Sequence, residues 1–341
     1  MLDDKNLNLT FLISDLKTHY LSNYLLINEL TRRKHHVKTI KLSHAEKTSN
    51  AINLVSEDSI ALVERLTEKL ENRCSILLLH GISAYKNNYV RSIKKYDNIL
   101  VPTESWVKGR EATLKEKQKN LFCSNGWNKL DWYYKFLKNK QTIKEYIYNK
   151  YKFDKNKKLI VYAPTGYRMG YETFKKWQTN NWSKKLYQDH GIGYLKKDIL
   201  KIIRKHANVY AIDHPCVNRE DIVQDRLKVM AIADLFIGDI SSMTLEFSVM
   251  DKPIIQISKN KEDSFDGDFN MFHNPNLELL DFGPIVSLGD LDKTIKESLV
   301  NDFHRERRNN LKDKYVGLFD GRCAKREADT IEEICSQYIK K

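Results

Sequence analysis

The sequence LTFLIS at Leu9–Ser14 opens the pattern that decides the fold. This apolar run is typical of a short strand, and the following stretch, HYLSNYLLINELTRR, has helical periodicity. His36–Leu42 (HVKTIKL) then alternates apolar and polar residues as a strand does. A strand, a helix and a strand in this order predict the β-α-β unit of a parallel sheet.

The same alternation continues along the chain. Ile52–Leu70 has helical periodicity, whereas Ser75–Leu79 and Asn98–Val101 are short apolar runs of the buried-strand type. After the lysine-rich, helical stretch Ile143–Tyr151 and the charged sequence DKNKK, a second series of alternating strands and helices begins. The second half is predicted to hold strands at Leu159–Tyr162, Val209–Ile212, Leu235–Ile237 and Pro253–Ile257, and helices at Tyr194–His206, Ile222–Ala231 and Ser241–Met250. We therefore expect an α/β protein with two facing Rossmann-like domains, residues 1–152 and 153–341, and a central cleft.

Composition narrows the class of protein. The 341 residues are 41% hydrophobic with only 13 Gly and 6 Pro, which is typical of packed domains and excludes a disordered or collagenous chain. The five cysteines are scattered and form no C-x-x-C pair, so we expect a reducing compartment. The sequence has no apolar run of membrane-helix length, and its start, MLDDKNLNL, lacks the plan of a secretory signal. We expect a cytoplasmic protein.

The net charge of +13 is concentrated in one segment. Between Lys108 and Lys158 there are fifteen Lys or Arg against five Asp or Glu, interleaved with nine aromatic residues from Trp127 to Phe153. This pattern fits a surface that binds an anionic membrane or a nucleic acid. It fits equally a solvated helix face whose aromatic side chains turn into the core.

Residues that directly follow strands deserve most weight, because parallel sheets bind ligands beyond the carboxyl ends of their strands. Four places stand out, and none is a P-loop or a G-x-G-x-x-G turn. They are His80-Gly81, Ala163-Pro164-Thr165 with Arg168, His214-Pro215, and Asp239-Ile240-Ser241-Ser242.

Each of these groups alone has an ordinary structural explanation, such as a serine N-cap, a turn before proline or a surface arginine. Together they suit the transfer of an anionic group from a nucleotide donor. Ser241 and Ser242 at a helix start can bind phosphate, and Glu246, one turn later on the same face, can accept hydrogen bonds from a ribose. A histidine can remove the proton from an acceptor hydroxyl.

Six segments, densest between residues 75 and 330, resemble in the same order the motifs of the CDP-glycerol glycerophosphotransferases that build teichoic-acid and related capsule polymers. The segments are Leu79-His80-Gly81 with Lys86 (W-H-G-T-P-L-K in the family), Asn125–Asp131 (G-Y-P-R-x-D), Tyr162–Thr165 with Arg168 (Y-A-P-T-W-R), His214-Pro215 (H-P), Ala233–Ser242 with Glu246-Phe247 and Asp251–Ile255 (A-D-x-x-I-x-D-Y-S-S, D-Y, D-K-P-I-I), and Asp320–Arg326 (D-G-x-A-x-x-R).

This resemblance implies a GT-B architecture with an acceptor-side N-terminal domain and a donor-side C-terminal domain. It implies an enzyme that moves an alcohol phosphate, glycerol phosphate first, from a CDP-activated donor to a hydroxyl of a cell-surface glycopolymer or its lipid-linked precursor, releasing CMP. His80 and His214 would be the catalytic residues, with His80 as the general base. The residues that would bind the donor phosphates and nucleotide are Thr165, Arg168, Pro215, Asp239, Ser241, Ser242 and Glu246.

The sequence departs from the family at Ile82-Ser83, at Ile240, at Glu246 and by one extra residue before Arg168. Glycerol phosphate, ribitol phosphate and a sugar therefore stay open as the transferred group, the alternative being a GT-B glycosyltransferase for capsule or lipopolysaccharide synthesis. A noncatalytic nucleic-acid-binding protein is the third hypothesis, and we expect no nucleic-acid partner. We expect the basic segment to hold the enzyme on the inner face of the membrane, and no cofactor except Mg²⁺ brought with the donor pyrophosphate.

Overall fold

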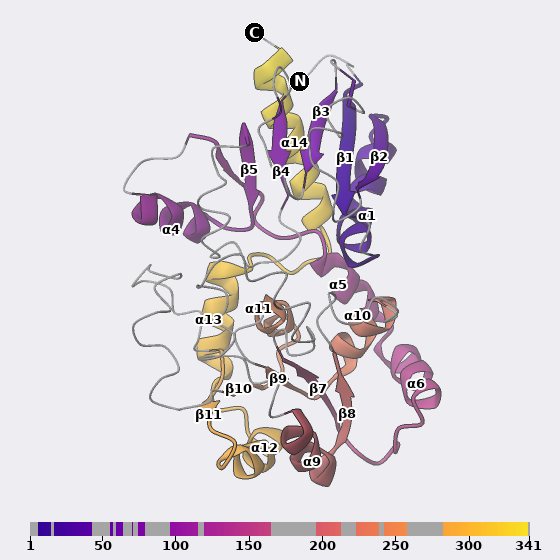
Figure 1. Ribbon diagram of the computed structural model, residues 1–341, viewed down its shortest axis with the longest axis vertical. Helices are drawn as coiled ribbons and strands as arrows, with labels where there is room; N and C mark the ends of the chain where they lie inside the picture. Colours follow the sequence, from indigo (N-terminus) through magenta and orange to yellow (C-terminus); the bar gives the residue numbers. More distant parts are fainter. Residues whose placement is uncertain are drawn as a thin grey trace, which may run out of the picture. The chain divides into compact units, whose positions relative to one another are not determined.

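The chain, seen in a computed structural model, is divided into two α/β units (Figure 1). Unit 1 comprises Met1–Tyr134, Met271–Asn276 and Lys314–Lys341, and unit 2 comprises Lys135–Asn270 and Leu277–Asp313. The structure describes residues 6–14, 17–42, 55–56, 59–63, 70, 74–78, 96–114, 119–164, 196–212, 223–238, 242–257 and 282–339.

Unit 1 is built on a six-stranded parallel sheet with the strand order β2-β1-β3-β4-β5-β6. The inner strands β1, β3, β4 and β5 are mainly buried and apolar, as expected where both faces of a parallel sheet are covered, whereas the edge strand β2 is largely exposed. The elements are β1 (Asn8–Ser14), α1 (Lys17–Arg32), β2 (His36–Leu42), β3 (Ile60–Val63), β4 (Ser75–Leu77), β5 (Asn98–Val101), α4 (Glu104–Leu114), β6 (Leu121–Cys123), α5 (Leu130–Lys138, which continues into unit 2) and α14 (Cys323–Ile339).

The third strand corrects the sequence prediction. Helical periodicity was expected over Ile52–Leu70, but Ile60–Val63 forms β3, which pairs with β1 and β4 in the middle of the sheet. Ala61, Leu62 and Val63 are fully buried there. A four-residue apolar run has no periodicity of its own, so the flanking residues gave a misleading helical pattern.

The C-terminal helix α14 packs on the sheet of unit 1, although the sequence placed it in the second domain. Ala328, Ile331, Ile334 and Cys335 are fully buried among the apolar side chains of β1, β3, β4 and β5. The exposed side of α14 is joined to the end of α1, because Arg33 forms ion pairs of 2.7 Å with both Asp329 and Glu332.

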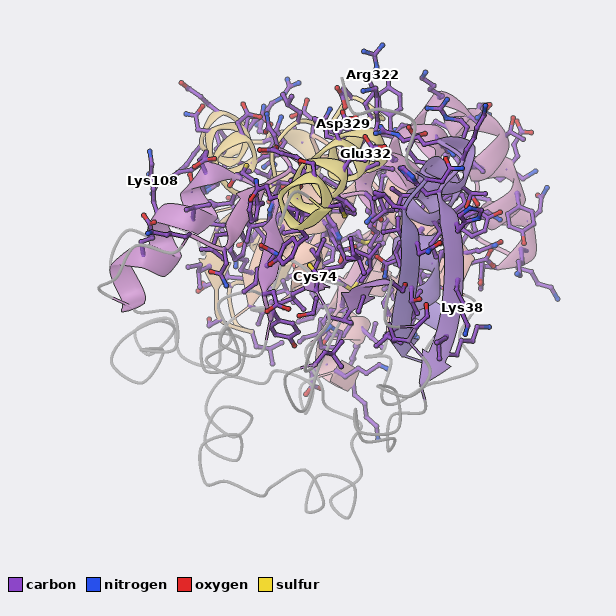
Figure 2. The ribbon with its side chains drawn as sticks, turned by 90° about the horizontal axis from the view of Figure 1, so that it is seen from above. Lys38, Cys74, Lys108, Arg322, Asp329 and Glu332 are labelled. Atoms are coloured by element: carbon purple, nitrogen blue, oxygen red, sulfur yellow. The ribbon has the colours of Figure 1, made fainter. Side chains whose placement is uncertain are left out.

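Figure 2 labels these two carboxylates next to each other on the helix. Helix α14 therefore completes the core of unit 1, which also contains β1.

Unit 2 is built on a five-stranded parallel sheet with the order β11-β10-β9-β7-β8. All five residues of β7 are buried, as a central strand between two helical layers should be. The elements are α6 (Lys140–Lys150), β7 (Leu159–Ala163), α9 (Lys196–His206), β8 (Asn208–Ala211), α10 (Val223–Ile232), β9 (Leu235–Gly238), α11 (Ser242–Ser248), β10 (Ile254–Ile257), β11 (Ile285–Val286), α12 (Leu291–Val300) and α13 (Arg305–Tyr315, which continues into unit 1).

The core of unit 2 lies between this sheet and its helices. Ile199 and Ile203 of α9, together with Ile295 of α12, are fully buried against alternate residues of β7, β9 and β10. The amphipathic pattern of α9, KKDILKIIRKH, places its apolar residues three and four positions apart on that face. Both predicted α/β repeats are confirmed, and each forms a separate parallel sheet.

Candidate functional site

The carboxyl edge of the sheet in unit 2 has a topological switch point between β7 and β9. After β7 the chain adds β8 on one side and then crosses to β9 on the other side of β7. The chain leaves β7 toward β8 and leaves β9 toward β10, in opposite directions along the sheet, and such a switch point is the usual ligand site of parallel sheets. Ala163 pairs with Gly238 at this edge.

Backbone packing at the switch point is close. A Cβ on Gly238 would lie 3.3 Å from the carbonyl oxygen of Ala163 and 2.6 Å from the Phe236 ring. Glycine is required at the last position of β9 because no side chain fits there. This close packing fixes the point from which the Asp239–Ser242 segment leaves the sheet.

Three of the predicted segments follow adjacent strands at this edge. Arg168 follows β7, His214 follows β8, and Asp239 follows β9 in the sequence. Because the strands are parallel neighbours, their carboxyl ends meet at one edge. Several predicted residues lie outside the described part of the chain: His80, Thr165, Arg168, His214, Pro215, Asp239 and Ser241.

Two predicted residues are described, Ser242 and Glu246. Ser242 is the first residue of α11, as the helix-start prediction required. Glu246 is only 2% exposed, so its carboxyl group is shielded from solvent. Burial of an acidic side chain is costly unless it is paired, which makes Glu246 a residue with a specific partner.

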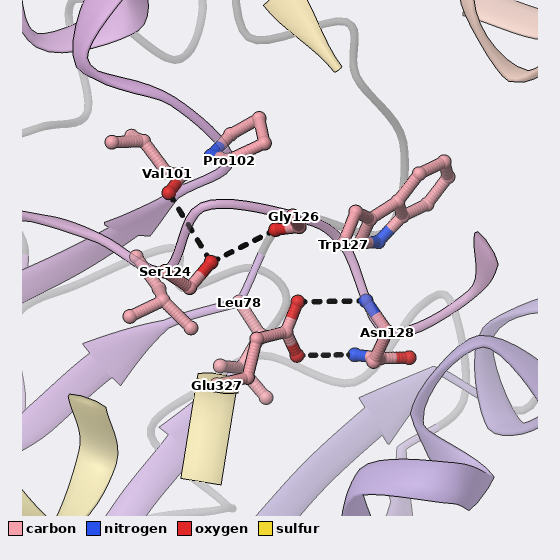
Figure 3. Close-up of a pocket in the computed structure, with 9 residues that line it drawn as sticks. Leu78, Val101, Pro102, Ser124, Gly126, Trp127, Asn128 and Glu327 are labelled. Carbon is pink, nitrogen blue, oxygen red and sulfur yellow. Dashed lines mark hydrogen bonds between the residues drawn. The ribbon is translucent and has the colours of Figure 1, made fainter. Parts of the chain in front are cut away.

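The carboxyl edge of the sheet in unit 1 carries a small cavity that the sequence did not predict. It has a volume of about 10 Å³ and lies where β4, β5 and β6 end. Ser124 closes the loop after β6 by donating from its hydroxyl to the Gly126 carbonyl at 2.9 Å (Figure 3). The residues that line the cavity are Leu78, Leu100, Val101, Pro102, Ser124, Gly126, Trp127, Asn128 and Glu327.

A buried carboxyl group, that of Glu327 on α14, forms one wall of this cavity. It accepts hydrogen bonds from the backbone N–H of Asn128 at 2.9 Å and from the Asn128 side-chain amide at 2.6 Å (Figure 3). Burial nevertheless raises the pKa of Glu327 to about 8, since the two hydrogen bonds only partly offset the loss of water. Glu327 is 4% exposed.

Two of the motif-like segments contact each other beside the cavity. The Asp131 carboxylate accepts hydrogen bonds from the backbone N–H groups of Cys323 at 3.0 Å and Ala324 at 2.9 Å, and so caps the first turn of α14. Arg326 donates to the Asn125 carbonyl at 2.9 Å and pairs with Asp320. We name this contact between residues 125–131 and 320–327 the motif joint.

The motif joint gives the two segments a structural role. Gly321 has φ +76°, and a Cβ there would lie 2.3 Å from the Tyr134 ring. Gly126 is equally confined, since its Cβ would lie 2.9 Å from the Arg326 guanidinium. No local pattern could have revealed a contact between residues about 200 positions apart, although the resemblance did single out both segments.

Comparison with known proteins identifies the family of the chain. Residues 3–333 match the family described as CDP-Glycerol:Poly(glycerophosphate) glycerophosphotransferase. The chain belongs to this family. It is therefore an enzyme that transfers glycerol phosphate from CDP-glycerol, as the six motif-like segments predicted.

Solved structures agree on the fold of the transferase. The wall teichoic acid polymerase TagF is 15% identical with a TM-score of 0.65, over 100% of this chain and 93% of that one. The UDP-GlcNAc 2-epimerase from Neisseria meningitidis bound to UDP-GlcNAc is 12% identical with a TM-score of 0.58, over 96% of this chain and 100% of the other. These neighbours have the GT-B type of fold, which confirms the predicted class. No curated protein matches the sequence significantly.

Three aromatic residues of the basic segment lie in the core, as the second of the two interpretations expected, and binding to a membrane stays a prediction. Trp127, Tyr133 and Tyr148 are 4%, 0% and 3% exposed and belong to the core, whereas Tyr146 is 43% exposed. Lys135, Lys138, Lys152, Lys155, Lys157 and Lys158 are exposed. Within the described ranges no helix is long and apolar enough to cross a membrane.

Proposed function

We propose that the transferase binds CDP-glycerol at the switch point between β7 and β9 of unit 2. The observation that carries this proposal is the topology, because three predicted donor-binding segments follow adjacent parallel strands at one edge. Arg168 and His214 would bind the pyrophosphate, helped by Thr165, Pro215 and Asp239. Ser241 and Ser242 would bind phosphate, and the buried Glu246 would bind the ribose.

The acceptor would be a hydroxyl of a cell-surface glycopolymer or of its lipid-linked precursor. His80, next to the end of β4 in the sequence, would remove the proton as the hydroxyl oxygen attacks the phosphorus that carries glycerol. A new oxygen–phosphorus bond forms, and the bond from that phosphorus to CMP breaks. Arg168 and His214 would stabilise the charge that builds up on the departing CMP and on the transferred group.

The decisive assay is CMP release from CDP-glycerol by the wild type, His80→Ala and His214→Ala. CDP-ribitol and UDP- and CMP-sugars serve as competing donors. We expect CDP-glycerol to be the best donor and each substitution to lower turnover by at least about 100-fold, the usual worth of a positioned acid or base. Donor binding should survive His80→Ala.

Full turnover by His80→Ala would refute its assignment as the base. Activity with a nucleotide sugar alone would make the protein a GT-B glycosyltransferase. Mg²⁺ held by the donor pyrophosphate is a further part of this proposal, and loss of activity in EDTA with recovery on added Mg²⁺ would support it.

The lysine surface of unit 2 would hold the enzyme on the cytoplasmic face of an anionic membrane. It consists of the exposed residues Lys135, Lys138, Lys152, Lys155, Lys157 and Lys158. Each lysine near such a surface contributes about 1 kcal/mol at physiological salt. Because the aromatic side chains face mainly inward, we expect electrostatic attraction to dominate.

Co-sedimentation with vesicles of neutral and anionic lipid tests this surface. We expect binding to rise with anionic lipid and to fall at high salt, with Lys155→Glu and Lys157→Glu weakening it and the exposed Lys197→Glu on α9 serving as the control. Binding that ignores lipid charge would contradict the proposal. Binding to plain DNA or RNA that exceeds binding to vesicles would favour a nucleic-acid partner instead.

A further inference from the structure

The amino edge of the sheet in unit 2 places one lysine on each side of an aspartate. Lys158 directly precedes β7, Asp234 directly precedes β9, and Lys252 comes two residues before β10. Because β9 lies between β7 and β10, the two strands that the lysines precede are about 10 Å apart. Asp234 accepts a hydrogen bond from the Leu159 N–H at 2.9 Å, and the Lys158 Nζ lies 3.8 Å from its carboxylate.

Helix α6 adds two more lysines to the same place. Lys140 and Lys144 are four positions apart and so lie on one side of the helix, where like charges repel each other. Burial lowers the pKa of Lys140, and the charges of the three other lysines lower it further, whereas Asp234 opposes them. Lys140 therefore lies within reach of the charge of each of the others. We name Lys140, Lys144, Lys158 and Lys252 the amino-edge cluster.

The positive charge of this cluster exceeds what the fold neutralises. Within the described part of the chain Asp234 pairs with Lys158 alone, and Lys140, Lys144 and Lys252 form no ion pair. These three side chains are partly buried, so water and salt screen their charges less than those of exposed lysines. Like charges held together without a counter-charge destabilise a fold, and such an arrangement is typical of a site that binds an anion.

The position of the cluster indicates an anion other than the donor. β7 spans five residues, or about 16 Å, between the amino edge and the carboxyl edge that the proposed donor segments follow. Lys252 belongs to one of the motif-like segments, but the proposed donor site does not use it. Lys158 belongs also to the lysine surface, and the exposed Lys155 and Lys157 precede it in the same loop. The cluster is therefore continuous with the surface proposed to face a membrane.

We propose that the amino-edge cluster binds the phosphate group of an anionic phospholipid, so that the lysine surface contains a defined head-group site. Lysine ammonium groups bind phosphate as point charges and donate hydrogen bonds to its oxygens. A bound phosphate would replace the repulsion among the lysines with attraction. This inference rests on the membrane attachment in the proposed function and is independent of the transfer reaction.

Co-sedimentation with vesicles of phosphatidylglycerol in phosphatidylcholine tests the site one lysine at a time. Lys140→Gln and Lys252→Gln each remove one charge of the cluster, and we expect each to weaken binding about tenfold, because their charges are poorly screened. The fully exposed Lys155→Gln should weaken it by roughly fivefold or less. Lys197→Gln, exposed in the first turn of α9, is the control and should change nothing.

Two outcomes of this experiment overturn the site. Equal losses from Lys252→Gln and Lys155→Gln would mean that the membrane attracts the surface diffusely. A wild type that ignores the anionic lipid would refute membrane attachment as well. Neither outcome touches the transfer reaction, because CMP release from CDP-glycerol without vesicles tests that separately.

Thermal unfolding without vesicles gives a second signature. Because neighbouring lysines repel Lys140, Lys140→Gln should raise the Tm of the free protein by about 1–2 °C. Soluble glycerophosphoglycerol, the head group without its acyl chains, should then raise the Tm of the wild type more than that of the variant. A lower Tm for Lys140→Gln would identify a lysine that stabilises the fold and overturn the proposal. Equal stabilisation by inorganic phosphate, with vesicle binding that ignores Lys252→Gln, would identify a site for free phosphate and overturn the lipid assignment.

Discussion

Replacing Glu327 by glutamine should change how the stability of the protein depends on pH. Glutamine has almost the same shape as glutamate but cannot ionise, so it imitates the protonated carboxyl group. Glu327 is buried beside Asn128, and its burial raises the pKa from 4.5 to about 8. Asp131 nearby adds to the rise, and Arg326 opposes it.

The sign and size follow from that shift. Below pH 4.5 the carboxyl is protonated in both the folded and the unfolded chain, and its contribution does not vary with pH. Between pH 4.5 and 8 it ionises in the unfolded chain only, so the wild type loses about 1.4 kcal/mol of unfolding free energy per pH unit. Above pH 8 both states are ionised and the loss stops growing. Relative to Glu327→Gln, the wild type should lose about 3 kcal/mol between pH 5.5 and 8.

Urea unfolding of both proteins at several pH values between 5.5 and 9 measures this difference, because the other titrating groups are common to the two. Glu333→Gln, an exposed position on the same helix, is the control and should show no comparable change. A difference that stays flat with pH, or one in which the wild type gains on the variant as pH rises, would show that Glu327 is ionised in the folded protein throughout.

Three further substitutions test other contacts by urea unfolding. Asp131→Ala removes the cap of α14 and should lower the free energy of unfolding by about 1–2 kcal/mol, with Asp131→Asn costing less; an unchanged value would refute the capping role. Asp225→Asn should lower the free energy of unfolding by about 2–4 kcal/mol at pH 7 and by less below pH 3.8. Burial raises the pKa of the Asp225 carboxyl, but its lysine and tyrosine partners outweigh burial and hold the pKa below its usual value. Gly321→Ala should lower the free energy of unfolding by more than about 1 kcal/mol, because alanine disfavours the positive φ and its Cβ would collide with the Tyr134 ring. Gly289→Ala, whose Cβ would meet only a hydroxyl at 3.7 Å, should lower it little.

Local patterns predicted most of the fold because buried parallel strands are short apolar runs bounded by helices. Leu159–Ala163 is such a run, and all five of its residues are buried. Ile60–Val63 was missed because four apolar residues among helical-looking neighbours carry no period. The dependence of unit 1 on α14 was missed for a different reason, since an amphipathic helix does not specify which sheet it covers.

In the candidate site, too, local sequence predicts some residues, whereas contacts that depend on packing are not predictable from it. The residues after the strands of unit 2 could be predicted as site residues because their position in the sequence implies the edge of the sheet where they emerge, and they stay a prediction. Glu246 was found by its helical spacing from Ser242, but its burial depends on packing that no spacing reveals. The pair of Asn128 and Glu327 was missed because its members stand 199 residues apart, although the resemblance singled out the segment that contains Asn128.

The return of α14 to unit 1 has a consequence for how the chain acquires its structure during synthesis. Domains usually fold in the order in which they leave the ribosome. Here the sheet that begins at Asn8 lacks the apolar cover of Ile331 and Ile334 until α14 (Cys323–Ile339) has been made. Unit 2 consists of Lys135–Asn270 and Leu277–Asp313, so all of its residues have been synthesised once the ribosome has passed Asp313. We expect the second unit to form first on the ribosome, and a nascent chain stopped before Cys323 to expose the surface that α14 would cover.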